Sequence, residues 1–446
     1  MYVLYSLLIV MFGVIASPYL VYQALRYKKY IASLGQRMGY LPVSFNLDGE
    51  ESIWIHAVSV GEALTVRALI SDLKRRYPNL RVFLSTTTLA GQQVARRNVP
   101  DVDAVFYFPF DLSFIVRRTL RLVKPRLFIM METEIWPNLL RQCKRLGVAT
   151  VMVNGRISSR SYPRYKLVRL FFAKVLADVD RFCMQSEESA RRLIDIGAEP
   201  ARVAVTGSLK FDSMEVPGAT TIEGRGQNRV LRYFRITGGR PVIVAGSTMG
   251  DEEEIVLQAF RRIKGSVANP LLVIAPRNPE RFAEVVQLAK NQAFVTVRRS
   301  DLPIDAEPRA EVVVLDTIGE LAQVYQIATA VFVGGSLVES GGHNILEPAV
   351  FGKPIVFGSH MHNFKEIADA FIAHHAGIQV STARGLEDAL LALLTDPVRR
   401  ARLGAAARAL VESNRGAKDK SLAVIAQVLP LRSGSMAVVR TFRVVH

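Results

Sequence analysis

The apolar residues of this chain gather in short continuous runs, and longer stretches with a helical period separate one run from the next. The runs are rich in β-branched and aromatic residues and lie at Ile53–His56, Val82–Ser85, Val105–Phe108, Leu127–Met131, Thr150–Val153, Phe182–Gln185, Val242–Ala245, Leu271–Ala275, Val312–Leu315, Val331–Val333 and Ile355–Phe357. Continuous apolar strands that alternate with amphipathic helices are typical of parallel sheets with helices on both faces. The pattern therefore predicts an α/β fold.

The alternation of strands and helices is interrupted at Glu215–Gly239, which is poor in large apolar residues and rich in Gly, Thr and Arg. This interruption indicates a connector, so we predict two Rossmann-like doubly wound domains that face a cleft. A chain of 446 residues is long enough for two such domains. The predicted parts are a membrane anchor, a first domain that binds the acceptor, a linker, a second domain that binds the nucleotide donor, and a tail, at residues 1–26, 27–214, 215–240, 241–431 and 432–446.

The N-terminal segment from Tyr2 to Leu25 is uncharged and almost wholly apolar. Its length is about that needed to cross the ~30 Å hydrocarbon core of a bilayer. Arg26 and further basic residues follow at once, and the positive-inside rule then places the rest of the chain in the cytoplasm. A cleaved signal peptide would have a basic start and a shorter apolar run. We expect a single uncleaved anchor in a bacterial inner membrane, although Pro18 leaves a shallow insertion open.

Charge is unevenly distributed along the chain, whose formal net charge is +17. Residues 1–210 hold 30 Lys and Arg against 16 Asp and Glu, and the remainder holds 27 against 24. Because no helix-turn-helix, zinc-finger or aromatic RNA-binding pattern is present, we expect no nucleic-acid partner. Anionic lipids of the inner membrane explain the basic first half and agree with the apolar N-terminus. Cys143 and Cys183 fit no disulfide or metal-site spacing, and each is predicted to be a buried small side chain.

Candidate chemistry in the first half lies just after the predicted strands, where ligands of open α/β sheets bind. Glu62, in the segment SVGEA, follows the first strand and falls in the first turn of a helix whose N-cap is Ser59. It is a candidate proton acceptor, although the helix dipole would keep it ionised and lower its basicity. A carboxylate that only complements the dipole is the competing interpretation.

Two further candidates share this sheet edge. Glu132 and Glu134 end a strand before Pro137, where a buried charge needs a partner, so they either form a salt bridge or contact a substrate. Lys210, in GSLKFD, follows a short strand and could neutralise a leaving phosphate, although most lysines are simply solvated.

In the second half, Pro276, Arg277 and Arg281 come directly after a strand, and arginine suits bidentate contact with phosphate or carboxylate. Gly319 and Glu320 follow at the start of another predicted helix.

The glycine-rich segment VFVGGSLVESGGHNILEPA predicts a strand, a loop and then a helix that begins near Asn344, since Pro348 is tolerated only in a first helical turn. Such a loop favours an anion through free amide groups, and Glu347 would face the same ligand and accept hydrogen bonds from a ribose. His343 alone is a loop or cap residue. No Asp-x-Asp metal motif follows a predicted strand in a suitable place, and no Walker sequence or histidine cluster is present, so we expect no metal and no other cofactor.

Together these segments resemble the 3-deoxy-D-manno-oct-2-ulosonic acid (Kdo) transferases of lipopolysaccharide assembly, a glycosyltransferase family of the GT-B fold. The matching segments are SVGEA, ETEIWPN, GSLKFD, APRNPERF, TIGEL and GGHNILEPA, which spread over residues 59–349. The N-terminal anchor matches as well, and the tail lies outside the resemblance.

The resemblance implies that Glu62 is the proton acceptor and that Glu132 and Lys210 stabilise the transition state. It implies that CMP, the nucleotide of the donor CMP-Kdo, is contacted by Pro276, Arg277, Ile318, Gly319, Glu320, Asn344, Ile345, Leu346 and Glu347. Ile318 stands where the family pattern has Met. The implied acceptor is lipid IVA, a phosphorylated and acylated glucosamine disaccharide, and the implied reaction is a single displacement that inverts the anomeric carbon.

Two other classes of function remain open on the residues alone. A membrane-anchored GT-B transferase that uses another sugar nucleotide on a lipid carrier would share the fold. A non-catalytic protein that binds anionic lipids would keep the basic face but would need neither Glu62 nor the segment around Asn344.

Overall fold

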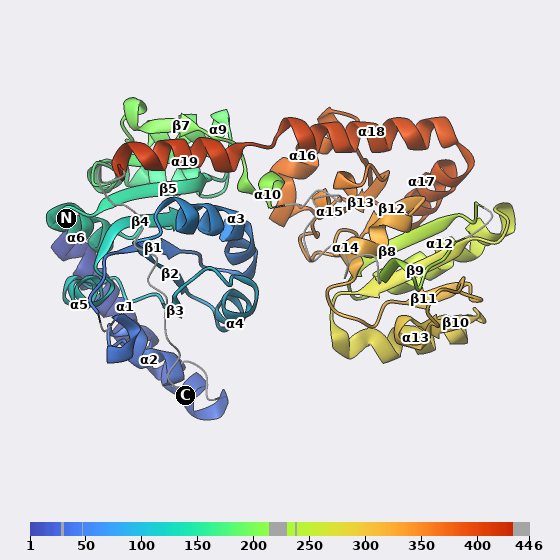
Figure 1. Cartoon of the computed structure of the whole chain (residues 1–446), viewed down its shortest axis with the longest axis horizontal. Coiled ribbons are helices and arrows are strands. Elements are labelled where there is room, and N and C mark those ends of the chain that lie inside the picture. The colour runs from blue at the N-terminus through green and yellow to red at the C-terminus, as the bar shows by residue number, and fades with distance from the viewer. Residues whose placement is uncertain (28–30, 47, 214–229, 237–238, 431–446) are drawn as a thin grey trace. The chain divides into compact units, whose positions relative to one another are not determined.

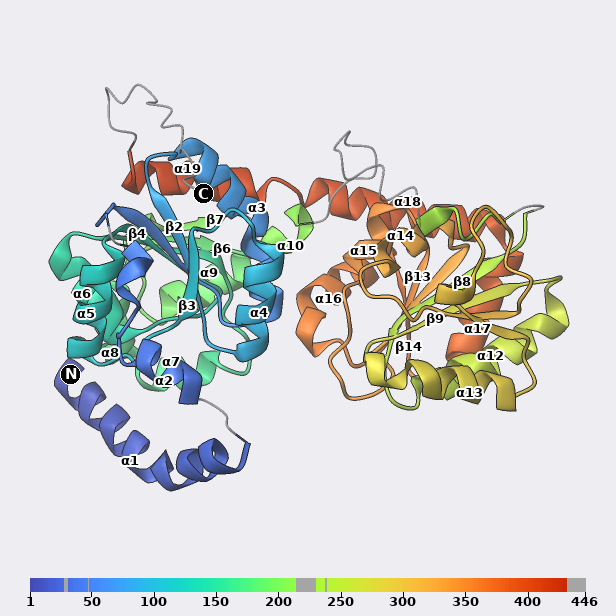
Figure 2. The ribbon, with the colours of Figure 1, turned by 60° about the horizontal axis from the view of Figure 1, so that its bottom comes forward.

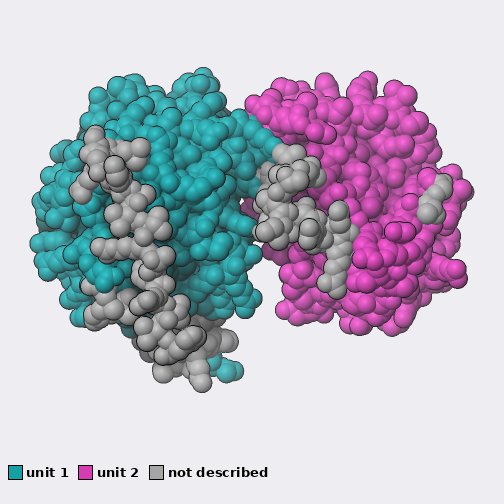
Figure 3. Space-filling view, viewed as in Figure 1, with its two compact units in different colours: residues 1–213, 415–446 teal, residues 214–414 magenta. Residues whose placement is uncertain are grey.

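The computed structural model describes residues 1–27, 31–46, 48–213, 230–236 and 239–430. The chain folds into two compact units, which Figure 3 shows in different colours. Unit 1 comprises Met1–Ser213 and Arg415–His446, and unit 2 comprises Met214–Asn414. Most of the predicted linker and the predicted tail fall outside the described residues.

Unit 1 is built on a parallel sheet whose seven strands, within the described residues, run in the order β3-β2-β1-β4-β5-β6-β7. The strands are β1 (Ser52–His56), β2 (Arg81–Thr86), β3 (Ala104–Tyr107), β4 (Pro125–Met131), β5 (Ala149–Gly155), β6 (Arg181–Met184) and β7 (Val203–Val205). The order reverses between β1 and β4, so the loops after these two strands flank the switch point at which open α/β sheets bind ligands.

Helices cover both faces of this sheet, as the doubly wound prediction requires (Figure 1). They are α1 (Tyr2–Tyr27), α2 (Ile31–Arg37), α3 (Val60–Arg76), α4 (Leu89–Asn98), α5 (Ser113–Val123), α6 (Pro137–Leu146), α7 (Tyr162–Leu167), α8 (Arg169–Leu176), α9 (Glu187–Asp195), α10 (Leu209–Asp212) and α19 (Ala417–Val428). Alternate residues of β1 enter different cores, with Ile53 and Ile55 packed on the face of α3 and Trp54 on the face of α5 and α6. This alternation explains why the strand is apolar throughout.

Unit 2 repeats the plan with a parallel sheet of order β10-β11-β9-β8-β12-β13-β14 in the described residues. Its strands are β8 (Val242–Thr248), β9 (Leu271–Pro276), β10 (Thr296–Arg298), β11 (Val312–Val314), β12 (Ala330–Val333), β13 (Ile355–Gly358) and β14 (Ile378–Val380). Its helices are α12 (Glu252–Ser266), α13 (Phe282–Asn291), α14 (Leu321–Val324), α15 (Leu346–Val350), α16 (Lys365–Ala373), α17 (Ala383–Thr395) and α18 (Pro397–Ser413). The switch point here lies between β8 and β12.

Two strands that the apolar pattern did not predict lie at the edges of the second sheet. These strands, β10 and β14, are three residues long, and each pairs with one neighbour. Because an edge strand buries little side-chain surface, its sequence carries a weak apolar signal.

The C-terminal helix α19 belongs to unit 1, although the predicted second domain extended to residue 431. The Asp212 carboxylate accepts hydrogen bonds from the amides of Gly416 (2.7 Å) and Lys418 (2.8 Å) at the start of α19. The Tyr77 hydroxyl donates to the carbonyl of Leu429 at its end (2.7 Å). The chain therefore crosses from unit 1 to unit 2 and back, which a reading of consecutive segments did not detect.

The apolar N-terminal segment forms a single helix, α1, which Figure 2 shows lying along the outside of unit 1. Within the described residues we find no helix with the length and apolar character needed to cross a membrane, so the expected spanning anchor at residues 1–26 is not supported. The first turn of α1 is instead tied to unit 1 by polar contacts. The Tyr2 hydroxyl donates to Asp178 (2.6 Å), and the Tyr5 hydroxyl donates to Asp111 (3.0 Å).

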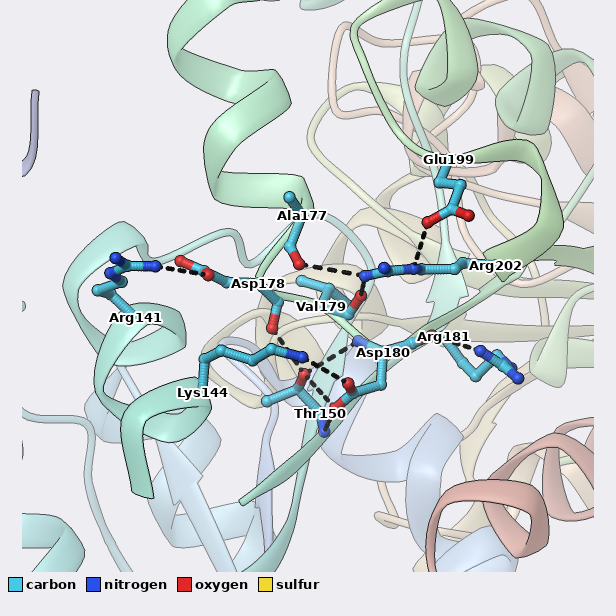
Figure 4. A network of polar contacts seen from close by, with 10 residues as sticks. All are labelled: Arg141, Lys144, Thr150, Ala177, Asp178, Val179, Asp180, Arg181, Glu199 and Arg202. Atoms are coloured by element: carbon cyan, nitrogen blue, oxygen red, sulfur yellow. Dashed lines mark hydrogen bonds and ion pairs between the residues drawn. The ribbon is translucent and has the colours of Figure 1, made fainter. Parts of the chain in front are cut away.

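Asp178, which accepts from Tyr2 of α1, belongs to a polar network at the amino ends of β5 and β6 (Figure 4). Asp178 pairs with Arg141 of α6 (3.1 Å), and Asp180 accepts a hydrogen bond from the amide of Thr150 (2.8 Å). The network lies at the opposite end of the strands from the loops that carry the candidate catalytic residues. Its role is to hold α6, α8 and the sheet together.

Candidate active site

Unit 1 brings two of its predicted catalytic residues to the switch point of its sheet. Glu62 lies in the first turn of α3, which follows β1, and Glu132 follows β4 directly. Since β1 and β4 are hydrogen-bonded neighbours, the two loops start side by side. The carboxylate of Glu132 is close enough to act electrostatically on that of Glu62.

Glu62 also caps its own helix. Ser59 is the N-cap, and its hydroxyl accepts a hydrogen bond from the amide of Glu62 while it donates to the Glu62 carboxylate (3.0 Å). The amide of Val58 donates to the other carboxylate oxygen (2.9 Å). The segment S-V-G-E therefore resembles a capping box, except that the Glu62 carboxylate accepts from the amide of Val58 and not from that of the N-cap Ser59, and this structural role is compatible with a catalytic one.

The electrostatics of Glu62 differ from the expectation of lowered basicity. Burial and, to a smaller extent, the neighbouring charge of Glu132 together raise the pKa of its carboxyl to about 7, against hydrogen bonds from Val58 and Ser59 that lower it. Desolvation and a like charge outweigh the helix terminus here. A carboxyl with a pKa near neutrality is well matched to accepting a proton at physiological pH.

Glu132 and Glu134 occupy a constrained turn after β4. Glu132 has a left-handed backbone conformation (φ 53°), which a non-glycine residue rarely adopts, and its amide donates to Val153 of the neighbouring strand (3.0 Å). Glu134 accepts a hydrogen bond from the indole of Trp136 (2.9 Å) and lies 3.5 Å from the buried imidazole of His56. The carboxylate of Glu134 therefore has partners within unit 1, the indole of Trp136 and the neighbouring ring of His56.

Lys210 lies in the short helix α10, near the end of the first stretch of unit 1. Its amide donates to the hydroxyl of Ser208 (3.4 Å), and the residue is partly buried. Helix α10 packs against α3 and α19, so the helix with Lys210 contacts the helix whose first turn contains Glu62. The candidate catalytic residues of the N-terminal half thus belong to one unit.

Unit 2 carries the predicted donor contacts on the loops after β9, β11 and β12. Pro276 is buried at the end of β9, whereas Arg277 is exposed and its amide donates to the carbonyl of Thr248 (2.9 Å). Arg281, by contrast, pairs with Glu253 and Glu284, each at 3.2 Å. Arg277 is thus the better placed of the two arginines to meet a ligand.

The loop after β11 presents backbone rather than a free carboxylate. Gly319 adopts a left-handed conformation (φ 89°), and the side chain of Ile318 is 83% exposed. The carboxylate of Glu320 is held by Arg299 (2.9 Å) and by the hydroxyl of Thr317 (2.6 Å). A ligand at this loop would therefore meet the backbone and the exposed edge of Ile318.

In the glycine-rich loop after β12, the first backbone amides donate their hydrogen bonds to a side chain of the protein itself. The fully buried carboxylate of Glu252 accepts hydrogen bonds from the amides of Gly335 (2.6 Å), Ser336 (2.9 Å), Leu337 (2.8 Å) and Met249 (2.9 Å). The phosphate was expected farther along this segment, at the helix start near Asn344. At the start of the loop after β12 a buried glutamate is the anion that the amides bind, and it links the loops after β8 and β12 across the switch point.

The helix predicted near Asn344 is α15, which begins at Leu346 and has five residues with Pro348 in its first turn. Ile345 and Leu346 are fully buried in the core, so only their backbone can face a ligand. The side chain of Asn344 donates to the Glu347 carboxylate (3.3 Å), and burial raises the pKa of Glu347.

Beside this segment lies His343, whose pKa is lowered to about 4 by burial and by the charge of Arg277. It is therefore neutral at pH 7. Arg277, which follows β9, acts electrostatically on both His343 and Glu347, which lie at and beyond the end of the glycine-rich loop.

Sequence reasoning missed Glu252 and His56. Glu252 begins a run of three glutamates at the start of α12, which the sequence explains as complementing the helix dipole. Glu252 differs from Glu254 of the same run by being buried, which the sequence does not reveal. His56 ends an apolar strand, where a histidine gives no periodic signal. The described residues contain no group of three or more His, Cys, Asp and Glu side chains arranged to hold a metal ion.

Two protein families match this chain, one within unit 1 and the other within unit 2. Residues 32–213 match the family described as 3-deoxy-D-manno-octulosonic-acid transferase (kdotransferase), and residues 254–410 match glycosyl transferases group 1. Among solved structures, a UDP-GlcNAc 2-epimerase from Neisseria meningitidis aligns with 84% of this chain and all of its own (TM-score 0.58) at 12% identity, which shows a shared fold.

Similar sequences extend over nearly the whole chain. A 3-deoxy-D-manno-octulosonic acid transferase of Haemophilus influenzae is 34% identical over 395 residues, which are 88% of this chain and 91% of that protein. The protein of the same name from Bordetella pertussis is 33% identical over 382 residues, 83% and 86% of the two chains. Identity at this level over most of both chains shows that this chain belongs to the 3-deoxy-D-manno-octulosonic acid transferases and is a glycosyltransferase.

Proposed function

We propose that this protein transfers Kdo from CMP-Kdo to lipid IVA during assembly of the lipopolysaccharide inner core. The family membership supports the reaction type, and the motifs that resemble the Kdo transferases support this donor and this acceptor. The basic character of residues 1–210 agrees with a phosphorylated acceptor, because Lys and Arg side chains favour anionic groups.

The proposed step is a single displacement at the anomeric carbon of Kdo. Glu62 accepts the proton of an acceptor hydroxyl while its oxygen forms the new glycosidic bond, and CMP leaves with the electron pair of the bond that breaks. Inversion follows because attack and departure take place on opposite faces of the sugar. Lys210 offsets the charge of the departing phosphate, and the Glu132 carboxylate stabilises the positive charge that develops on the sugar.

On the donor side, Arg277 is proposed to meet the phosphate of CMP, since its guanidinium is exposed beside a strand end. Pro276, Ile318, Gly319, Ile345 and Leu346 contribute backbone contacts, because their side chains are buried, absent or apolar. Asn344 and Glu347 present polar groups to the ribose, while Glu320 acts by shaping its loop through Arg299.

The observation that carries this function is the carboxyl of Glu62 at the switch point, with its pKa raised to about 7. Replacing it by Glu62→Gln should lower kcat by about 10²–10⁴-fold, the usual contribution of a general base, without weakening CMP binding in calorimetry. Glu187→Gln is the matched control, because Glu187 also lies in the first turn of a helix of unit 1 but is exposed. Turnover of Glu62→Gln at the rate of this control would contradict the role.

A donor screen tests the alternative that another sugar nucleotide is used. Purified protein is incubated with lipid IVA and either CMP-Kdo or UDP-sugars, and the mass of the lipid product is measured by mass spectrometry. Mass gain in steps of one Kdo with CMP-Kdo alone supports the proposal, and the number of steps gives the number of residues added. Transfer from a UDP-sugar with none from CMP-Kdo would contradict it.

We also propose that unit 1 rests on the cytoplasmic face of the inner membrane through apolar side chains of α1 and of the α7–α8 segment. Leu7, Phe12 and Ile15 of α1 are exposed, and Leu167 and Leu170 are 88% and 78% exposed. The start of α1 lies beside α8, because the rings of Tyr2 and Tyr5 contact Phe171. Basic side chains, among them Arg164, Lys166 and Arg169, adjoin this surface and favour anionic headgroups.

Flotation with phosphatidylglycerol vesicles tests this membrane contact. The double variant Leu167→Ser/Leu170→Ser should bind fewer vesicles than the unchanged protein. Val398→Ser is the control, because Val398 is equally exposed (78%) but lies on unit 2. Equal binding by both variants would show that the α7–α8 segment does not contact the bilayer.

A further inference from the structure

Asn154 lies near the carboxyl end of β5 in a backbone conformation that few residues tolerate. Its backbone is left-handed (φ 58°), and its side chain is fully buried. The preceding carbonyl, of Val153, accepts a hydrogen bond from the amide of Glu132 (3.0 Å). Since Met131 pairs with Val153 in the register of β4 and β5, Glu132 and Asn154 are the next residues along the two neighbouring segments. Asn154 therefore lies beside one of the proposed catalytic residues.

The side chain of Asn154 reaches the helix that carries Lys210. Its Oδ1 accepts a hydrogen bond from the amide of Leu209 (3.0 Å), and both groups are buried. Because a backbone amide can only donate, the atom that faces it is the oxygen of the carboxamide. The carbonyl of Asn154 accepts a further hydrogen bond from the side chain of Gln185, which follows β6 (2.8 Å). Both the side chain and the backbone of Asn154 are thus fixed.

Helix α10 has four residues, too few to be stable through its own hydrogen bonds, so its neighbours set its position. Its first two amides donate to side chains. Asn154 accepts from the amide of Leu209, and the hydroxyl of the N-cap Ser208 accepts from that of Lys210 (3.4 Å). The carbonyl of Lys210 accepts from the hydroxyl of Ser213 (2.8 Å). The first turn of α10 is therefore fixed by β5 as well as by its own cap.

We propose that Asn154 is a positioning residue for the transfer reaction. Its carboxamide, together with the hydroxyl of Ser208, fixes the first turn of α10 and so the backbone from which the Lys210 side chain extends. Because the end of β5 also holds the turn of Glu132, one strand end determines where both residues lie. The inference rests on the proposed role of Lys210, which offsets the charge of the departing phosphate. Asn154 acts through Lys210 and not through contact with a substrate.

A double-mutant cycle tests whether Asn154 acts through Lys210. Asn154→Gly removes the acceptor but leaves the left-handed backbone without strain. It should lower kcat by about 10–10²-fold, because small displacements of a catalytic group have effects of this size. In the Lys210→Ala background the same substitution should lower kcat by less than about twofold. Asn269→Gly is the matched control and should leave kcat unchanged, because Asn269 is also left-handed (φ 47°) but is exposed on unit 2.

Ser208→Ala is a second variant at a half-buried position, so the test does not depend on the folding of Asn154→Gly. It should also lower kcat, and only when Lys210 is present. The fluorescence of Trp54 and Trp136 reports whether unit 1 is folded in each variant. If the folded variants lowered kcat by the same factor with and without Lys210, or left it unchanged, the start of α10 would not position Lys210 and the inference would be wrong.

Hydrogen exchange measures the contact itself, independently of catalysis. In the full-length protein, the peptide that contains Leu209 and Lys210 should exchange faster in Asn154→Gly than in Asn269→Gly, because the amide of Leu209 has lost its acceptor. Equal exchange in these two variants would contradict the role of Asn154 in holding α10. Faster exchange, together with a Lys210→Ala variant that turns over at the rate of the unchanged protein, would instead refute the role of Lys210 in the proposed function.

Discussion

Replacing Glu252 by Ala should open the glycine-rich loop of unit 2. The carboxylate of Glu252 accepts four backbone hydrogen bonds at 2.6–2.9 Å, and its side chain is fully buried. A buried donor left without its acceptor costs about 1–3 kcal/mol, and charged acceptors lie at the upper end. The amides of Gly335 and Ser336 lie in buried surroundings, whereas those of Met249 and Leu337 are only partly buried and can recover water. We therefore expect a loss of about 4 kcal/mol.

The measurement must report on unit 2 alone. Both tryptophans, Trp54 and Trp136, lie in unit 1, so intrinsic fluorescence would follow the wrong unit. Hydrogen exchange followed by mass spectrometry of peptides that contain β8 and β12 gives the free energy of opening directly.

Glu254→Ala is the matched control, because Glu254 lies in the same helical turn, is exposed, and accepts a hydrogen bond only from neighbouring Gln258 among the bonds found for it (3.2 Å). Its effect should stay within about 0.5 kcal/mol. If Glu252→Ala changed the opening free energy by less than about 1 kcal/mol relative to this control, the assignment of Glu252 as the anion that holds the loop would be wrong.

Three further predictions follow from the same structure. Gly246→Ala should destabilise unit 2 by about 1–3 kcal/mol, because a Cβ at Gly246 would overlap the Tyr325 hydroxyl. Adding Tyr325→Phe should restore part of this loss of stability in thermal unfolding. At Gly358 the added Cβ would meet the backbone carbonyl of Ser336, so no side-chain substitution at Ser336 should restore the stability of Gly358→Ala. Since the folded-state pKa of Glu62 is raised to about 7, its stabilising contribution is complete below its unfolded pKa and is lost as pH rises through 7. Glu62→Gln should therefore be more stable than the unchanged protein at pH 8, by roughly 2 kcal/mol after allowance for solvent screening, and an equal or lower stability in urea would contradict the raised pKa. His343, with a pKa lowered to about 4, should show no protonation between pH 6 and pH 8 in ¹⁵N NMR, and a midpoint near 6.5 would show that Arg277 and burial do not act on it as described.

Much of the fold follows from the apolar pattern. The runs Ile53–His56 and Val242–Ala245 lie in the central strands β1 and β8, and both sheets are parallel, as continuous apolar strands predicted. The edge strands β10 and β14 were missed because they bury little. The return of α19 to unit 1 was missed because a helix carries no mark of the sheet on which it packs.

The sequence predicted where the candidate residues lie on the sheet, but not how buried they are or which charges surround them. Placing residues at strand ends located Glu62 and Glu132 beside one another, since parallel strands carry their loops to the same edge. The direction of the pKa shift at Glu62 was predicted incorrectly, because the helix terminus is visible in the sequence but burial and a like charge are not.

The sequence by itself therefore determined the fold class, the family and the loops that carry polar groups, because strand periodicity, turn residues and motifs are local properties. Only the tertiary structure decided which charges meet. Glu252 reaches the amides of Gly335, Ser336 and Leu337 more than eighty residues away, and His56 reaches Glu134 across adjacent strands. Such contacts depend on burial and distance in three dimensions, and these arise only after the helices and strands have packed.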